Sequence, residues 1–93
     1  MQFTKKLHDG IRSGKISCSV RIWRRAHVRA GGRYKFGEGE IEVDSIVPIK
    51  RKDITPALAR RSGFESVAAL MRIAKHGPGE QVFLIEFHYV PPL

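Results

Sequence analysis

The sequence predicts a single α+β domain over residues 1–93, with a small mixed β-sheet or partly closed β-barrel flanked by short helices. Two observations predict this class. Apolar residues recur with helical spacing near the start and again after residue 55, whereas residues 17–49 and 81–90 carry strand patterns. The length is that of one small domain, and a hydrophobic content of 42% is typical of a folded chain.

The first element is a predicted helix from Phe3 to Ser13, because Phe3, Leu7 and Ile11 share one helical face and Gly14 is a suitable stop. Residues 17–25, "SCSVRIWRR", then alternate as a strand does. We expect one face of this strand to lie in the core (Cys18, Val20 and Ile22) and the other to be polar with one aromatic ring (Ser19, Arg21, Trp23 and Arg25).

The middle of the chain reads as two short strands. Gly31-Gly32 indicates a hairpin turn, and Arg33 to Phe36 resumes as a strand. Residues 40–49 form the next strand. In a regular strand, Ile41 and Val43 would point to one face and Ile46 to the other. A β-bulge near Asp44-Ser45 would turn Ile46 to the same face as Ile41 and Val43.

The second helical region begins at Thr55-Pro56, a cap followed by proline at the first helical position. Ser62 and Glu65 have the spacing of a capping box for a following amphipathic helix, which is expected to end at residues 76–79. The last segment, residues 81–90, is apolar on both faces. This is typical of a central strand, and a parallel closing strand is compatible with the helices before it.

The charge is strongly uneven. The net charge is +8, and residues 1–35 hold ten of the seventeen Lys and Arg residues against the single acid Asp9, whereas Glu38 to Asp44 is acidic. A basic surface of this size predicts a polyanionic partner. The single cysteine, Cys18, cannot form an internal disulfide, which favours a reducing compartment such as the cytoplasm, and no apolar run predicts a membrane span.

The strand at residues 17–25 carries the main candidate site. Arginine donates bidentate hydrogen bonds to phosphate, and tryptophan offers a stacking surface for a base. Arg21 needs a partner among apolar neighbours, and Glu86 is the candidate partner. We expect the nucleic-acid contacts to come from this strand and its flanks, from Lys15, Ser17, Ser19, Arg21, Trp23, Arg25 and Arg29.

Catalysis is the alternative interpretation. A lysine beside a serine can activate it, so Lys15, Ser19 and Glu86 are the catalytic candidates. His27 or His88 is a conceivable general base for RNA cleavage, although surface or capping roles are the simpler interpretation. No pair of histidines has a metal-binding spacing, so the sequence predicts no metal and no cofactor.

The chain resembles the ASCH domain family of the PUA-like superfamily. The resemblance rests on Ser17, Ser19 and Arg21 after the first helix, on the turn from His27 to Tyr34, and on the closing "VFLIEFHYV". It covers nearly the whole chain. It implies a PUA-like small mixed β-barrel with helices at its ends, and a cleft beside the Ser17–Arg21 strand in which RNA or a nucleoside-like ligand binds.

A subset of this family is similar to acetylcytidine amidohydrolases that read Lys-Thr-x-Thr-x-Arg. Ser17, Ser19 and Arg21 match its threonines and arginine, but Ile16 occupies the lysine position, with Lys15 one residue early. The glutamate of that subset would fall near Ser62, and Glu65 lies three residues away.

The sequence therefore predicts an RNA- or nucleotide-binding module with a basic cleft beside the Ser17–Arg25 strand and without catalysis of its own. The alternative is a hydrolase, a ribonuclease or an acetylcytidine-amidohydrolase-like enzyme, that uses the same cleft. A third class is a protein-interaction domain, in which the acidic segment Glu38–Asp44 meets a basic patch of a second copy.

Overall fold

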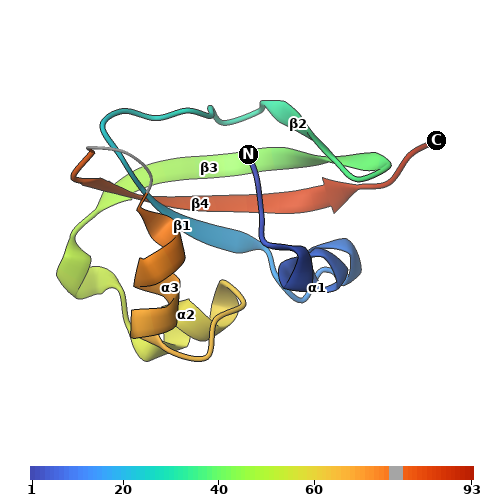
Figure 1. Cartoon of the computed structure of the whole chain (residues 1–93). Helices are drawn as coiled ribbons and strands as arrows, with labels where there is room; N and C mark the ends of the chain where they lie inside the picture. The colour runs from blue at the N-terminus through green and yellow to red at the C-terminus, as the bar shows by residue number, and fades with distance from the viewer. Residues whose placement is uncertain (76–78) are drawn as a thin grey trace.

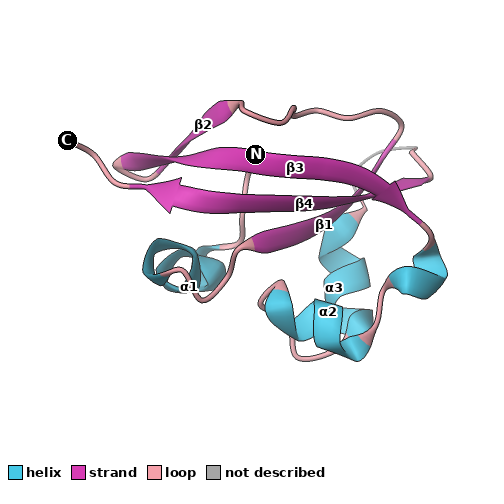
Figure 2. Ribbon diagram, turned by 180° about the vertical axis from the view of Figure 1, so that it is seen from behind, coloured by secondary structure: helices cyan, strands magenta, loops and turns pink. Residues whose placement is uncertain are grey.

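The computed structural model describes residues 1–75 and 79–93. Its elements follow in the order η1 (Lys5–Leu7), α1 (His8–Ser13), β1 (Cys18–Trp23), β2 (Arg33–Phe36), β3 (Gly39–Ile49), η2 (Arg51–Asp53), α2 (Pro56–Arg61), α3 (Val67–Ala74) and β4 (Gln81–Val90). The four strands form one curled sheet, a half-barrel, with short helices packed against it (Figures 1 and 2). This confirms the small α+β architecture.

The strand order is β1-β4-β3-β2, and every neighbouring pair is antiparallel. Strand β4 is central, as predicted, but the expectation of a mixed sheet with a parallel closing strand is wrong. The one parallel contact among the described residues is an isolated bridge between Ile22 and Lys75. Strands β1 and β2 lie at opposite edges, so the Gly31-Gly32 turn does not join a hairpin. Instead, residues 24–32 cross from one edge of the sheet to the other (Figure 1).

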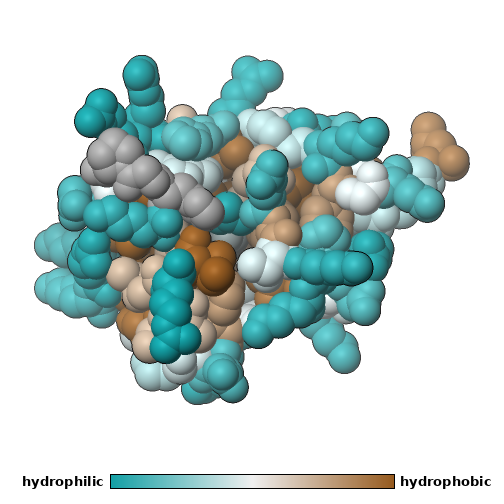
Figure 3. All heavy atoms as spheres, viewed as in Figure 1, coloured by the Kyte–Doolittle hydropathy of each residue, from teal (hydrophilic) through white to brown (hydrophobic). Residues whose placement is uncertain are grey.

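Two hydrophobic clusters lie on the two faces of the sheet. One packs Cys18, Val20 and Ile22 of β1 against α2 and α3. The other contains Trp23 and Phe87 with Leu7 of η1, Ile11 of α1 and Val28 of the 24–32 segment. Apolar atoms are visible beside α3 and across the middle of the molecule, with hydrophilic side chains around them (Figure 3).

The alternation predicted for β1 is correct, but the polar face is not exposed. All six residues of β1 are buried, including Ser19, Arg21 and Trp23. The N-terminal segment and the 24–32 segment cover this face, and neither contact is encoded in the local pattern of the strand. Arg25 is an exception, because β1 ends before it and its side chain is exposed.

Local signals at the element ends are mostly confirmed. Gly14 ends α1 with φ of 84°, and the Thr55 side chain accepts a hydrogen bond from the Leu58 amide at 3.1 Å. The capping box at Ser62 and Glu65 is wrong, because Ser66 caps α3 by accepting from the Ala69 amide. Ser62 ends α2 instead and donates to the Leu58 carbonyl. Helix α3 ends at Ala74, just before the stop predicted at residues 76–79, of which 76–78 lie outside the described residues.

The predicted β-bulge is present. The register shifts between Val43, which pairs with Phe87, and Ser45, which pairs with Glu86. This places Ile46 opposite Ile85, on the face that also holds Ile41 and Val43, so both halves of β3 contribute to the same core. Within residues 1–75 and 79–93, no helix has the length and apolar character needed to cross a membrane.

Candidate nucleic-acid interface

A cleft of about 250 Å³ lies over the buried end of β1, and we call it the Arg21 cleft. Two covering segments form it together with the sheet. The N-terminal segment crosses the sheet on the side that is turned to the viewer in Figure 1. The 24–32 segment runs along the top of the same view, above β3. The residues lining the cleft are Met1, Gln2, Arg21, Trp23, His27 and Val28.

Arg21 is the charged group at the base of this cleft. Its side chain is 7% exposed, its Nε donates to Ser19 Oγ at 2.9 Å, and its Nη2 donates to the main-chain carbonyl of Gln2. The guanidinium also lies 4.9 Å from the centre of the Phe3 ring. These contacts hold the group in one orientation, and all of its partners are neutral.

The positive charge of Arg21 is not balanced within the described chain. No carboxylate of residues 1–75 or 79–93 forms an ion pair with it, and Glu86 pairs with Arg61 at 3.2 Å instead. Burial lowers the pKa of the Arg21 guanidinium, yet arginine stays protonated at any physiological pH. Burial, followed by repulsion from Arg21, lowers the pKa of the Met1 amino group in the same cleft.

Trp23 and His27 form a parallel aromatic pair on one wall. Their ring centroids are 4.4 Å apart with an angle of 12° between the planes. Trp23 is buried and also packs on Phe83, whereas His27 is exposed. Trp23 is therefore the core side of the pair, and His27 is the side that faces solvent.

The segment bearing His27 is basic and is anchored at its far end. Gly31 and Gly32 exchange main-chain hydrogen bonds with Val43 of β3, at 2.7 and 2.9 Å. A side chain at Gly32 would collide with the Tyr34 hydroxyl, and that hydroxyl accepts from the Arg29 amide. Between these anchors and β1, the segment exposes three arginines to solvent, Arg24, Arg25 and Arg29.

The predicted nucleic-acid contacts fall into two groups. Arg21 and Trp23 line the cleft, Ser19 supports Arg21, and Arg25 and Arg29 are exposed on the segment that borders it. Lys15 and Ser17 are exposed at the opposite end of β1, next to the end of α1, and neither lines the cleft. The sequence did not single out Gln2 and Val28 for this site, because they reach it through contacts between distant segments.

The three catalytic candidates do not converge. Ser19 and Glu86 point to opposite faces of the sheet, because Ser19 pairs with Ile85 in the register and Cys18 pairs with Glu86. Lys15 is exposed before the strand begins. The Ser19 hydroxyl is buried and already accepts from Arg21, so the described side chains place no base beside it.

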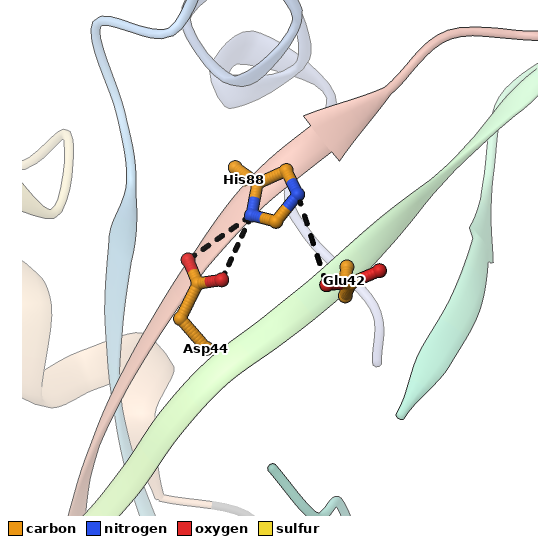
Figure 4. Close-up of side chains that lie close together, drawn as sticks. All are labelled: Glu42, Asp44 and His88. Carbon is orange, nitrogen blue, oxygen red and sulfur yellow. Dashed lines mark hydrogen bonds and ion pairs between the residues drawn. The ribbon is translucent and has the colours of Figure 1, made fainter. Parts of the chain in front are cut away.

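A second group of polar side chains, Glu42, Asp44 and His88, lies close together where β3 pairs with β4 (Figure 4). His88 Nδ1 lies 2.9 and 3.1 Å from the two carboxylate oxygens of Asp44, and His88 Nε2 lies 4.0 Å from Glu42 Oε2. Glu42 in turn accepts from Arg33 at 2.9 Å. No spacing along the chain could reveal this group, because the pairing of β3 with β4 assembles it.

Comparisons with known proteins add no relative to this description. No protein-family model, curated protein or solved structure matches the chain.

Proposed function

We propose that this chain binds RNA, or a nucleotide-like polyanion, at the Arg21 cleft, and that its role there is binding rather than catalysis. The proposal depends above all on Arg21. A buried guanidinium that has only neutral partners in the described chain is costly, and a bound phosphate supplies the missing negative charge.

The surroundings of Arg21 fit the other parts of such a ligand. A volume of about 250 Å³ suits a single nucleotide or a short stretch of backbone, and His27 offers an exposed ring for a base. Arg24, Arg25 and Arg29 are exposed on the segment that carries His27 and Val28 of the lining, and they suit the neighbouring phosphates of a longer ligand. Phosphate contacts of this kind dominate affinity and carry little sequence information.

The sequence resemblance to the ASCH domain family supports the same strand as the ligand site. We extend the proposal to that family and to a PUA-like version of the half-barrel, and we place the protein in the cytoplasm, where the free, buried Cys18 thiol stays reduced. The hydrolase interpretation receives less support, because Lys15, Ser19 and Glu86 lie apart.

The test is an anisotropy titration of a labelled single-stranded RNA decamer with the wild-type chain and two variants. Arg21→Met removes the charge in the cleft, and Arg61→Met removes an exposed arginine on the other face. Arg21→Met should weaken binding at least about tenfold, the loss of one charge-assisted contact of ~1.5–3 kcal/mol. Arg61→Met should stay within about twofold of wild type.

Equal binding by wild type and a folded Arg21→Met variant would refute the cleft as the RNA site. Recovering the RNA after the titration tests the other half of the proposal. Intact RNA is expected, and cleavage that is lost in Ser19→Ala would favour the hydrolase instead.

A further inference from the structure

Glu42, Asp44 and His88 bring three metal-ligating side chains together on the sheet, and we call them the Asp44–His88 cluster. One donor atom from each residue lies within 4.8 Å of the other two. Glu42 and His88 are direct partners in the β3–β4 register. Their neighbours Val43 and Phe87 belong to the core beside Trp23, so the cluster lies on the opposite face from the Arg21 cleft.

The β-bulge creates the contact between Asp44 and His88. Val43 pairs with Phe87, so in a regular ladder the next residue, Asp44, would stand opposite Glu86. The bulge gives that place to Ser45 and leaves Asp44 unpaired in the ladder. Asp44 thereby avoids a second carboxylate and turns both of its oxygens toward His88 Nδ1.

We propose that the Asp44–His88 cluster binds a divalent first-row transition-metal ion, with Zn²⁺ as the representative. One imidazole nitrogen with two carboxylates is a mixed donor set that suits these ions, whereas Mg²⁺ and Ca²⁺ prefer oxygen alone. The two carboxylate charges match the charge of the ion. The three side chains are 30–50% exposed, which leaves room for water to complete the coordination.

Side-chain rotation has to bring one nitrogen of His88 and one oxygen of each carboxylate onto the same ion. Donor atoms on one tetrahedral Zn²⁺ lie about 3.4 Å apart, given metal–ligand bonds of about 2.1 Å. The contacts in the cluster are 2.9 Å from His88 Nδ1 to Asp44 and 4.0 Å from His88 Nε2 to Glu42, so they involve different imidazole nitrogens, and a single ion can use only one of the two. One donor atom from each residue nevertheless lies within 4.8 Å of the other two. All three residues stand on paired strands, so their backbone positions are fixed before a metal arrives.

Arg33 orients Glu42 for this role. Its Nε donates to Glu42 Oε1 at 2.9 Å, and the other oxygen, Oε2, is the one that faces His88. Glu40 lies 3.7 Å from Arg33 but is not part of the cluster. It therefore provides a matched control, a carboxylate on the same strand and beside the same arginine.

The experiment is calorimetric titration of ZnCl₂ into the untagged full chain at pH 7, in a buffer that does not bind metal. We expect one saturable site that a large excess of Mg²⁺ does not block. Glu42→Gln, Asp44→Asn and His88→Ala should each weaken binding by at least about tenfold, whereas Glu40→Gln should bind as wild type does.

Two results would overturn the proposal. One is the absence of saturable binding by wild type. The other is unchanged affinity in Asp44→Asn, an exposed and nearly isosteric substitution that leaves the fold intact. Thermal unfolding of each variant accompanies the titration, so that a loss of binding by a misfolded chain is recognised. Because the cluster lies on the face away from Arg21, the result is independent of RNA binding.

Discussion

The imidazole of His27 lies parallel to the indole of Trp23, with ring centroids 4.4 Å apart. On its other side Trp23 packs on Phe83 in a tilted arrangement, with ring centroids 6.0 Å apart and 43° between the planes. This aromatic column runs from the partly buried Phe83 through the buried Trp23 to the exposed His27, which lines the cleft together with Arg21. Such a column offers a base a preorganised surface at little cost in conformational entropy.

Replacing His27 tests this column. His27→Ala removes the surface on which a base is expected to stack, and base stacking on an aromatic ring is worth ~1–3 kcal/mol. We expect RNA affinity to fall by about fivefold or more in an anisotropy titration, with His88→Ala on the other face as the control. Tighter binding by His27→Ala would contradict the account, because it would mean that His27 blocks Trp23 rather than extending its stack.

A second prediction concerns the effect of the buried Arg21 charge on the stability of the fold. Replacing a buried charge by an apolar side chain of similar length is often neutral or stabilising. Arg21→Met should therefore unfold at the wild-type temperature or above it, while its RNA binding is weakened at least about tenfold. Thermal unfolding by circular dichroism measures this. A large drop in the unfolding temperature would mean that the hydrogen bonds to Ser19 and Gln2 stabilise the fold rather than position a ligand group.

The hydrogen bond from Arg21 to Ser19 predicts that substitutions of the two residues have non-additive effects on the free energy of unfolding. Ser19→Ala should destabilise the chain by about 1–3 kcal/mol, because it leaves the Arg21 Nε–H buried without its acceptor. In the double variant with Arg21→Met, that penalty should largely disappear. Denaturant unfolding of the four chains gives the coupling energy directly, and additive effects would contradict the contact.

The third prediction concerns the residue that caps the N-terminus of α3. Ser66→Ala removes the cap that accepts from the Ala69 amide and should cost about 1 kcal/mol. Glu65→Ala should change stability by less than ~0.5 kcal/mol, because the exposed Glu65 is not part of a capping box. Denaturant midpoints of the two variants decide between this assignment and the capping box suggested by the sequence.

The fourth prediction is a pH effect at Glu80. A hydrogen bond from Lys75, together with the charges of Lys75 and Arg51, lowers the pKa of this carboxyl below its ordinary value of 4.5. A lowered folded-state pKa means that Glu80 stabilises the fold above the unfolded pKa, and that this contribution is lost as pH falls through the folded pKa. Glu80→Gln should thus be less stable than wild type at pH 7, and the difference should vanish in acid.

An NMR titration of the Glu80 side chain checks the same point directly. A midpoint below 4.5 is expected in wild type, and a shift of that midpoint back toward 4.5 is expected in Lys75→Met. An unchanged midpoint in the variant would show that the 3.2 Å contact with Lys75 is not formed in solution.

The parts of this structure that follow from local chemistry could be predicted from the sequence. Gly14 ends α1 because only a residue free of steric strain at positive φ fits there. Val43 and Ile46 would point to opposite faces of a regular strand, and this indicated the bulge, because one extra residue turns both side chains to the same face. Thr55-Pro56 begins α2 because the threonine side chain accepts from a main-chain amide of the first turn and proline fits the first helical position.

Features that depend on distant contacts could not be predicted in this way. The pattern of β1 separates its two faces but cannot show that the N-terminal segment covers the second one, which turns an expected polar surface into a buried wall. The role of His27 and the meeting of Asp44 with His88 likewise depend on how segments are paired across the sheet. The sequence suggested Glu86 as the partner of Arg21, but the register places the two on opposite faces.

The most direct test of the central claim is a fluorescence titration of the wild-type chain with a short single-stranded RNA at low and moderate salt. Trp23 is the only tryptophan and lines the Arg21 cleft, so its emission reports on that place alone. The account predicts a saturable change in emission whose midpoint moves to higher RNA concentration as salt rises. RNA binding detected by anisotropy with no change in Trp23 emission at either salt would contradict it, because the RNA would then lie elsewhere.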